Sequence, residues 1–132
     1  MVDEIRKVTI TKIDSDSVET DDSFPLGLAF HVYLSEVPDS VWRELFFSEY
    51  EQTWYSLKRE MTVSGDKIRV VTAPGEEQGH VDFVKRLVEQ TNKQVDMYNA
   101  EVKRQRDLQR QNLGREGKLV EEARERLKRV RL

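Results

Sequence analysis

The sequence predicts an α+β fold: a small four-stranded sheet, antiparallel or mixed, with a helix on one face and a long C-terminal helical segment. Two patterns lead to this prediction. Before residue 74, apolar and polar residues alternate in short stretches, whereas from residue 80 onward apolar residues recur at spacings of three and four. The predicted order of elements is ββαββα. We expect residues 1–102 to form the α+β domain and residues 103–132 to form a basic C-terminal helical extension.

The first half of the sheet is predicted from two stretches. Residues 4–13, EIRKVTITKI, are rich in β-branched residues and predict a strand. Residues 14–23, DSDSVETDDS, contain five carboxylates and predict a polar loop. Residues 26–37 show strict period-two alternation, so one face of this strand is expected in the core, and the semi-apolar opposite face is expected to be partly covered as well. The predicted core face consists of Leu26, Leu28, Phe30, Val32 and Leu34.

A short amphipathic helix is predicted at 38–52, PDSVWRELFFSEYEQ. Pro38 marks its start, and Asp39 or Ser40 can cap the first turn. Phe47 lies off the apolar stripe and is expected to be an exposed apolar spot. The stripe itself, at helical spacing, consists of Val41, Trp42, Leu45, Phe46 and Tyr50.

The second half of the sheet is predicted as a hairpin. Residues 55–63 and 68–73 have strand character and are separated by the turn sequence SGDK. Arg59 interrupts the apolar face of the first strand. Because an unpaired buried charge is costly, Arg59 is expected either to pair with an acid, the favoured reading, or to bind an anion.

The helix predicted from His80 onward is unusually long. Its apolar seam later changes register, and the eleven residues between Val102 and Leu113 would permit a stutter in one continuous helix. Gly114 and Gly117, however, each cost about 1 kcal/mol in a helix interior, which favours a break into two helices. The first part of the seam, with the spacing of a heptad repeat, consists of Val81, Val84, Val88, Thr91, Val95, Tyr98 and Val102.

Residues with catalytic or ligand-binding chemistry form no recognisable motif. The chain has no cysteine, which excludes disulfides and thiolate metal sites. It contains no phosphate-binding loop, dinucleotide fingerprint or nucleophile elbow. His31, and His80 with the nearby Glu76, are candidates for a ligand site, but histidines without suitably spaced partners favour a structural role. We therefore expect a non-catalytic protein without a cofactor or metal, located in the cytoplasm and lacking a membrane span; an unrecognised enzyme with a site near the sheet is an alternative.

Charge is unevenly distributed along the chain. Residues 1–102 hold 11 basic and 20 acidic residues, a net charge of −9, whereas residues 103–132 hold 11 basic and 5 acidic residues, a net charge of +6. Such asymmetry is typical of an interaction tail. The basic residues that share helical faces in this tail are Lys103, Arg106, Arg110, Arg124, Lys128 and Arg131.

Three classes of partner suit a basic amphipathic helix. We favour a protein, either another copy of the chain or a different protein, because the seam is regular. Nucleic acid is the alternative, disfavoured by the acidic body, and a membrane surface ranks last because the tail has no Trp or Phe. The residues expected to contact the partner are Val88, Val95, Tyr98 and Val102, followed by Leu113, Val120, Leu127 and Val130.

Overall fold

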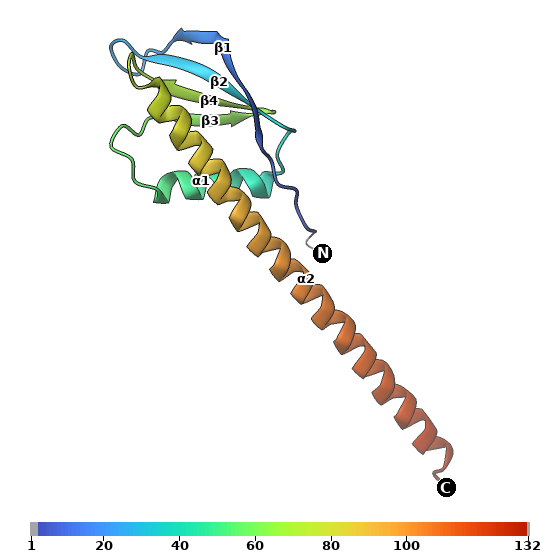
Figure 1. Ribbon diagram of the computed structural model, residues 1–132. Helices are drawn as coiled ribbons and strands as arrows, with labels where there is room; N and C mark the ends of the chain where they lie inside the picture. The colour runs from blue at the N-terminus through green and yellow to red at the C-terminus, as the bar shows by residue number, and fades with distance from the viewer. Residues whose placement is uncertain (1–2, 132) are drawn as a thin grey trace. The chain divides into compact units, whose positions relative to one another are not determined.

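The α+β fold is confirmed by a computed structural model that describes residues 3–131 (Figure 1). Four strands form one antiparallel sheet in the order β1-β2-β4-β3. The described chain divides into two compact units. One spans Ile5–Met97, and the other comprises residues 3–4 and 98–131. The elements are β1 (Ile10–Thr20), β2 (Leu28–Leu34), α1 (Ser40–Gln52), β3 (Met61–Ser64), β4 (Lys67–Thr72) and α2 (Glu77–Lys128).

The core of the unit Ile5–Met97 lies on one face of the sheet, where α1 and the first turns of α2 cover it (Figure 1). Val32 and Phe30 of β2 are paired in register with Ile68 and Val70 of β4, so period-two alternation places all four side chains on the covered face. The rings of Trp42 and Phe46 from α1, stacked with centroids 5.4 Å apart, close the core together with Phe83, Val84 and Leu87 from α2.

The predicted core face of β2 is correct for Phe30, Val32 and Leu34 but wrong at Leu26. Leu26 is 80% exposed and has a φ of 65°, in the left-handed region. The strand begins at Leu28, and the preceding turn closes where Asp21 N–H donates to the Gly27 carbonyl at 2.9 Å. This turn takes Leu26 out of the sheet, although its spacing matches that of the strand.

The prediction that residues 14–23 form a loop is wrong over 14–20, because β1 continues to Thr20. The pairing with β2 is irregular between Asp14 and Glu19. The Ser17 hydroxyl accepts a hydrogen bond from His31 N–H at 2.8 Å and donates to the Asp14 carbonyl at 2.6 Å. A polar side chain thus replaces part of the backbone ladder. β1 is an edge strand and none of its residues is fully buried, so the stretch lacks the alternation that marks a half-buried strand.

The first hairpin strand is shorter than predicted, since β3 starts at Met61 and residues 55–60 lie outside it. The Tyr55 ring stacks on Phe83 of α2, with centroids 4.8 Å apart, and the Leu57 carbonyl lies 2.7 Å from His80 Nε2. Contacts with α2 therefore hold this segment away from the strand path.

The predicted break of the long helix near Gly114 and Gly117 is wrong, because α2 is continuous from Glu77 to Lys128. A Cβ atom at either glycine would meet nothing within 4 Å, so both stand on open helix surface. The segment around them is rich in Leu, Arg, Glu and Lys, which are good helix formers. Propagating a helix that is already nucleated is much easier than starting one, so the two glycines do not end it.

Candidate interaction surface of the C-terminal helix

The first part of the α2 seam packs inside its own domain. Val84, Val88, Thr91 and Val95 are all buried. Two of the residues predicted to contact a partner, Val88 and Val95, belong to the hydrophobic core. A partner cannot reach them while the domain is folded, so the heptad spacing here serves intramolecular packing.

A polar residue beside this seam, Asn92, ties three segments of the domain together. Its Oδ1 accepts hydrogen bonds from Val8 N–H at 3.2 Å and from Trp42 Nε1 at 3.0 Å. Its Nδ2 donates to the Val8 carbonyl at 2.8 Å. Asn92 therefore fixes the N-terminal segment and α1 against α2. Nothing in the sequence distinguishes this asparagine from a solvated one.

The second unit begins with the turns of α2 around Tyr98 and Val102. Tyr98 is half-buried and Val102 is 9% exposed. The Glu4 carboxylate forms ion pairs with the Lys103 ammonium at 3.4 Å and with the Arg106 guanidinium at 3.7 Å. Two of the six predicted basic residues thus have an acidic partner within the chain.

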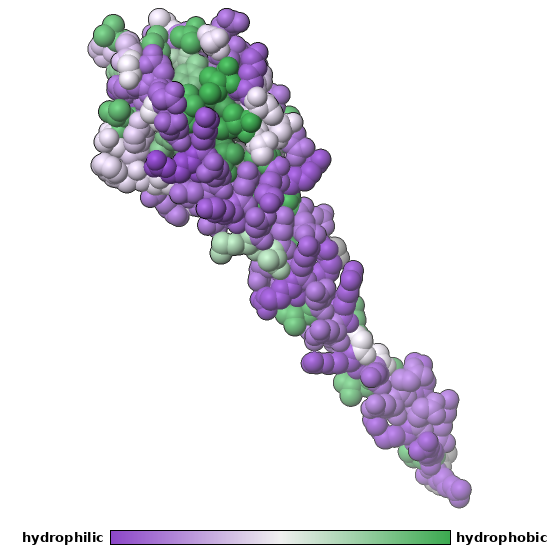
Figure 2. Space-filling model, in the orientation of Figure 1, coloured by the Kyte–Doolittle hydropathy of each residue, from purple (hydrophilic) through white to green (hydrophobic). Residues whose placement is uncertain are grey.

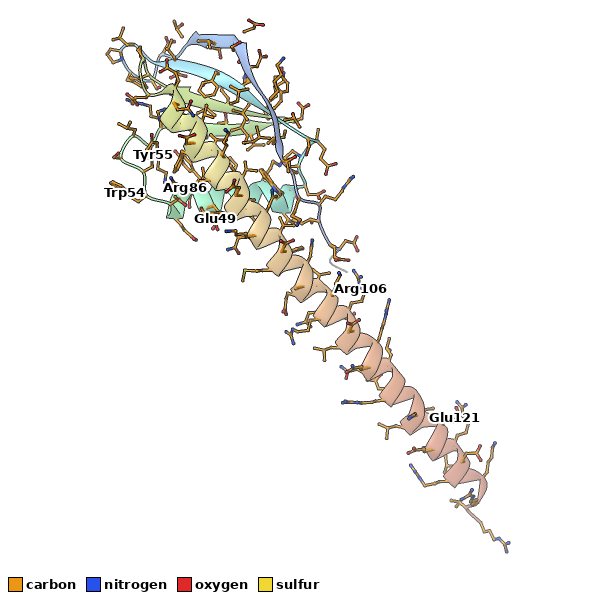
Figure 3. The ribbon with its side chains drawn as sticks, viewed as in Figure 1. Glu49, Trp54, Tyr55, Arg86, Arg106 and Glu121 are labelled. Atoms are coloured by element: carbon orange, nitrogen blue, oxygen red, sulfur yellow. The ribbon has the colours of Figure 1, made fainter. Side chains whose placement is uncertain are left out.

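Beyond Val102 the helix is open to solvent. From Lys103 to Arg131 every side chain is exposed except those of Arg106 and Ala123, which are half-buried. Leu113 and Leu127 are 68% and 69% exposed. In Figure 3 the side chains near Glu121 project from the helix in all directions, and Figure 2 shows small green groups along a mostly purple surface.

From Leu113 onward the apolar residues of this segment share one face, and Leu108, 40% exposed, lies just outside the edge of that face. Successive residues in an α-helix are about 100° apart, so the eleven residues from Val102 to Leu113 complete three turns with only about 20° left over. On a straight helix, Val102 and Leu113 therefore lie on the same face, although the heptad register of the seam changes between them. The face spans about 120°, which is the width of a stripe that packs on a neighbouring element. We call this face the tail stripe; it consists of Leu113, Leu119, Val120, Ala123, Leu127 and Val130.

Basic residues line one edge of the tail stripe. Lys103, Arg110, Arg124 and Arg131 fall at intervals of seven or fourteen residues, and Gly117 occupies the remaining place in this row. We call these four basic residues the basic edge. Within residues 3–131, no acidic side chain forms an ion pair with the last three of them. Of the other predicted basic residues, Lys128 pairs with Glu125 at 3.1 Å.

One acid of the second unit is held by its own helix. The Glu101 carboxylate accepts hydrogen bonds from Arg104 at 2.7 and 3.0 Å and from Gln105 at 2.9 Å. These bonds, the one from Arg104 above all, lower the pKa of Glu101 to about 2. Glu101 therefore stays ionised throughout the physiological range.

The candidate ligand residues of the domain have structural contacts. The ring of His80 is buried, with Nδ1 2.7 Å from the Thr72 hydroxyl and Nε2 2.7 Å from the Leu57 carbonyl. The expected acidic partner of Arg59 is confirmed: the guanidinium contacts both carboxylate oxygens of Glu76, at 3.2 and 3.3 Å. It also stacks 3.9 Å from the centre of a phenylalanine ring, that of residue 24.

His31 stands apart from these contacts and from any cluster of ligands. It is half-buried in β2, in register with Asp14 and Arg69. Over residues 3–131, no group of three His, Cys, Asp or Glu side chains is placed to hold a metal ion. The structure therefore gives His80 and Arg59 contacts within the domain and places His31 apart from both.

Large apolar side chains are also exposed on the domain. Phe47 is exposed, as predicted from its place off the α1 stripe. Trp54, which the sequence does not single out, is 82% exposed and lies on the outside of the connection between α1 and β3 (Figure 3). Exposed apolar residues are common on proteins, and we take the tail stripe as the candidate surface because its members share one face of an exposed helix.

The comparisons with protein-family models, curated proteins and solved structures found no match. Among the described helices, none has the length and apolar content needed to cross a bilayer.

Proposed function

We propose that the protein is a non-catalytic interaction module that assembles with a protein partner, or with further copies of itself, through the C-terminal helix after Val102. The observation that carries this proposal is the tail stripe, a set of apolar side chains on one helical face, interrupted by Glu116, that the rest of the described chain leaves uncovered. The absence of cysteine suits the reducing cytoplasm, where we place the protein.

The energetics of an isolated helix support a partner. Helical stability in proteins comes mostly from packing an amphipathic face rather than from intrinsic propensity. Covering a leucine or valine side chain contributes about 1.5–3 kcal/mol. Leu113, Leu127 and the valine between them, Val120, would supply most of this gain.

The test is the molar mass in solution, measured by light scattering at low and high salt. Three proteins are compared: the full chain, a chain that ends at residue 102, and a variant with Leu113→Gln, Val120→Gln and Leu127→Gln. A multimer that becomes a monomer in both altered proteins places self-assembly on the stripe. If the full chain is a monomer, the same three proteins serve as baits for a protein partner.

A matched variant controls for general changes to the helix. Lys118→Gln, Glu122→Gln and Arg129→Gln lie on the face opposite the stripe, at about 100° per residue, and should leave assembly unchanged. Loss of assembly in this variant, or its retention in the stripe variant, would contradict the proposal.

Nucleic acid is a second candidate because three arginines of the basic edge, Arg110, Arg124 and Arg131, have no acidic partner within residues 3–131. Binding to phosphates would fall steeply with salt and would not depend on the tail stripe. A raised ratio of absorbance at 260 to 280 nm in the purified protein would favour it.

A further inference from the structure

We infer that the partner of the C-terminal helix is an acidic amphipathic helix of another protein, and not the same helix of a second copy. This inference rests on the proposed function and specifies its partner. It follows from the charges that border and interrupt the tail stripe.

Both edges of the stripe lack acids. One is the basic edge, of which Arg110 and Arg124 form the middle. The row on the other edge, again at intervals of seven, consists of Gln105, Asn112, Leu119 and Arg126. In helix pairs the edge residues decide which partner is chosen and in which direction it runs. Of the acids of the tail, Glu122 and Glu125 lie away from both edges, whereas Glu121 lies next to the basic edge, three residues before Arg124, on the side away from the stripe.

An antiparallel pair of identical tails would bring like edges together. The basic edge of one helix would then face the basic edge of the other along its whole length. Such repulsion across an interface opposes association. In a parallel pair, the basic edge would meet a row that holds Arg126 and no acid, so no attraction is gained.

Two charges within the seam oppose a parallel pair more directly. Arg106 lies seven residues before Leu113 and therefore occupies a seam position. Glu116 lies fourteen residues before Val130 and occupies another. In a parallel pair of identical helices each seam residue lies beside its own copy. Glu116 would face Glu116 in the part of the interface with least water, and Arg106, whose guanidinium pairs with Glu4 at 3.7 Å, would face Arg106. Within residues 3–131, no cation forms an ion pair with Glu116.

A different helix can resolve both conflicts. Carboxylates along one of its edges would face the basic edge, and a lysine or arginine in its seam would meet Glu116. Leucine-sized residues at seven-residue intervals would cover Leu113, Val120 and Leu127. The same charges that would repel another copy would then select this partner, since specificity is a difference between the affinities for two partners.

The experiment uses the full chain and two labelled synthetic peptides of the tail's own length. Both peptides have leucine at the seam positions except for one lysine placed to meet Glu116; one peptide has glutamate and the other lysine on both edges. Fluorescence anisotropy should show the full chain binding the glutamate peptide at least about tenfold more tightly than the lysine peptide, a difference that shrinks with salt.

Three variants of the full chain, each checked for helicity by circular dichroism, isolate the cause. The stripe variant (Leu113→Gln, Val120→Gln, Leu127→Gln) should lose the binding, and the variant on the opposite face should retain it. The charge-reversal variant (Arg110→Glu, Arg124→Glu, Arg131→Glu) should prefer the lysine peptide, which a merely structural role of the arginines would not produce.

The outcomes separate this inference from the proposed function. A full chain that self-associates through the stripe, at both salt concentrations, would keep the proposed function and overturn the inference. Binding of a DNA duplex that is lost in the charge-reversal variant but kept in the stripe variant would replace the helix partner with nucleic acid. Failure to bind either peptide, in a chain that is a monomer, would count against both.

Discussion

The hydrogen bonds of Asn92 provide the sharpest test of how the domain is held together. Replacing Asn92 with alanine removes the acceptor of the Trp42 indole N–H and both partners of the Val8 backbone. Trp42 is fully buried and Val8 is nearly so, so water cannot readily replace what is lost. A buried polar group without a partner costs about 1–3 kcal/mol.

We therefore expect Asn92→Ala to lower the free energy of unfolding by about 3 kcal/mol, a large part of the roughly 5–15 kcal/mol that holds a typical domain. For a domain of this size the corresponding fall in Tm is about 12–24 °C. The assay is guanidinium unfolding followed by circular dichroism and tryptophan fluorescence. Lys93→Ala, an exposed neighbour on the same helix, is the matched control and should change stability by less than about 0.5 kcal/mol.

A double-mutant cycle with Trp42→Phe separates the hydrogen bond from packing. Phenylalanine has no N–H to leave unpaired, so in the Asn92→Ala background part of the penalty disappears. The two substitutions together should cost about 1–2 kcal/mol less than the sum of the single costs. Additive costs, or an Asn92→Ala variant as stable as the control, would refute the role given to Asn92.

Three further predictions follow from contacts in the described chain. Arg59→Gln should lower stability by about 1 kcal/mol, because the ion pair with Glu76 is partly shielded from water; equal denaturation midpoints for variant and parent would contradict this. Gly114→Ala and Gly117→Ala should each stabilise the helix by about 1 kcal/mol, seen as greater ellipticity of the warmed protein, whereas a decrease would mean that these sites need glycine. The depressed pKa of Glu101 implies that its ion pair stabilises the helix fully above the ordinary value of 4.5 and is lost as pH falls toward about 2; an NMR titration midpoint near 4.5 would show that the pair does not form.

The parts of the fold that could be predicted are those in which local pattern and tertiary packing agree. In β2, alternation alone locates Phe30 and Val32 on the buried face, because a strand has two faces and one is covered. The extension of β1 could not be predicted, since it depends on the Ser17 hydroxyl meeting a strand fourteen residues away in sequence. The contacts of Asn92 span 84 and 50 residues, which no local pattern reports.

The candidate surface shows a different limit of sequence reasoning. Val88 and Leu113 have similar sequence settings, each in a regular apolar seam, yet one is in the core and the other is 68% exposed. An apolar seam predicts that a helical face will be covered, but it does not identify the element or protein that covers it. For Val88 the cover is the hydrophobic core of its own domain, and this becomes known only when the other elements are placed.

The state of the uncovered segment affects how it would bind. A segment that folds on binding must spend part of its interaction energy on ordering the chain. The C-terminal helix is already formed up to Lys128, so contacts at a few anchors such as Leu113 and Leu127 can contribute more directly to affinity. With so few anchors, affinity from apolar contact alone would be indiscriminate, because many helices present leucines at this spacing. We infer that discrimination comes from the charges around the anchors: the basic edge beside the stripe, and Arg106 and Glu116 within the seam.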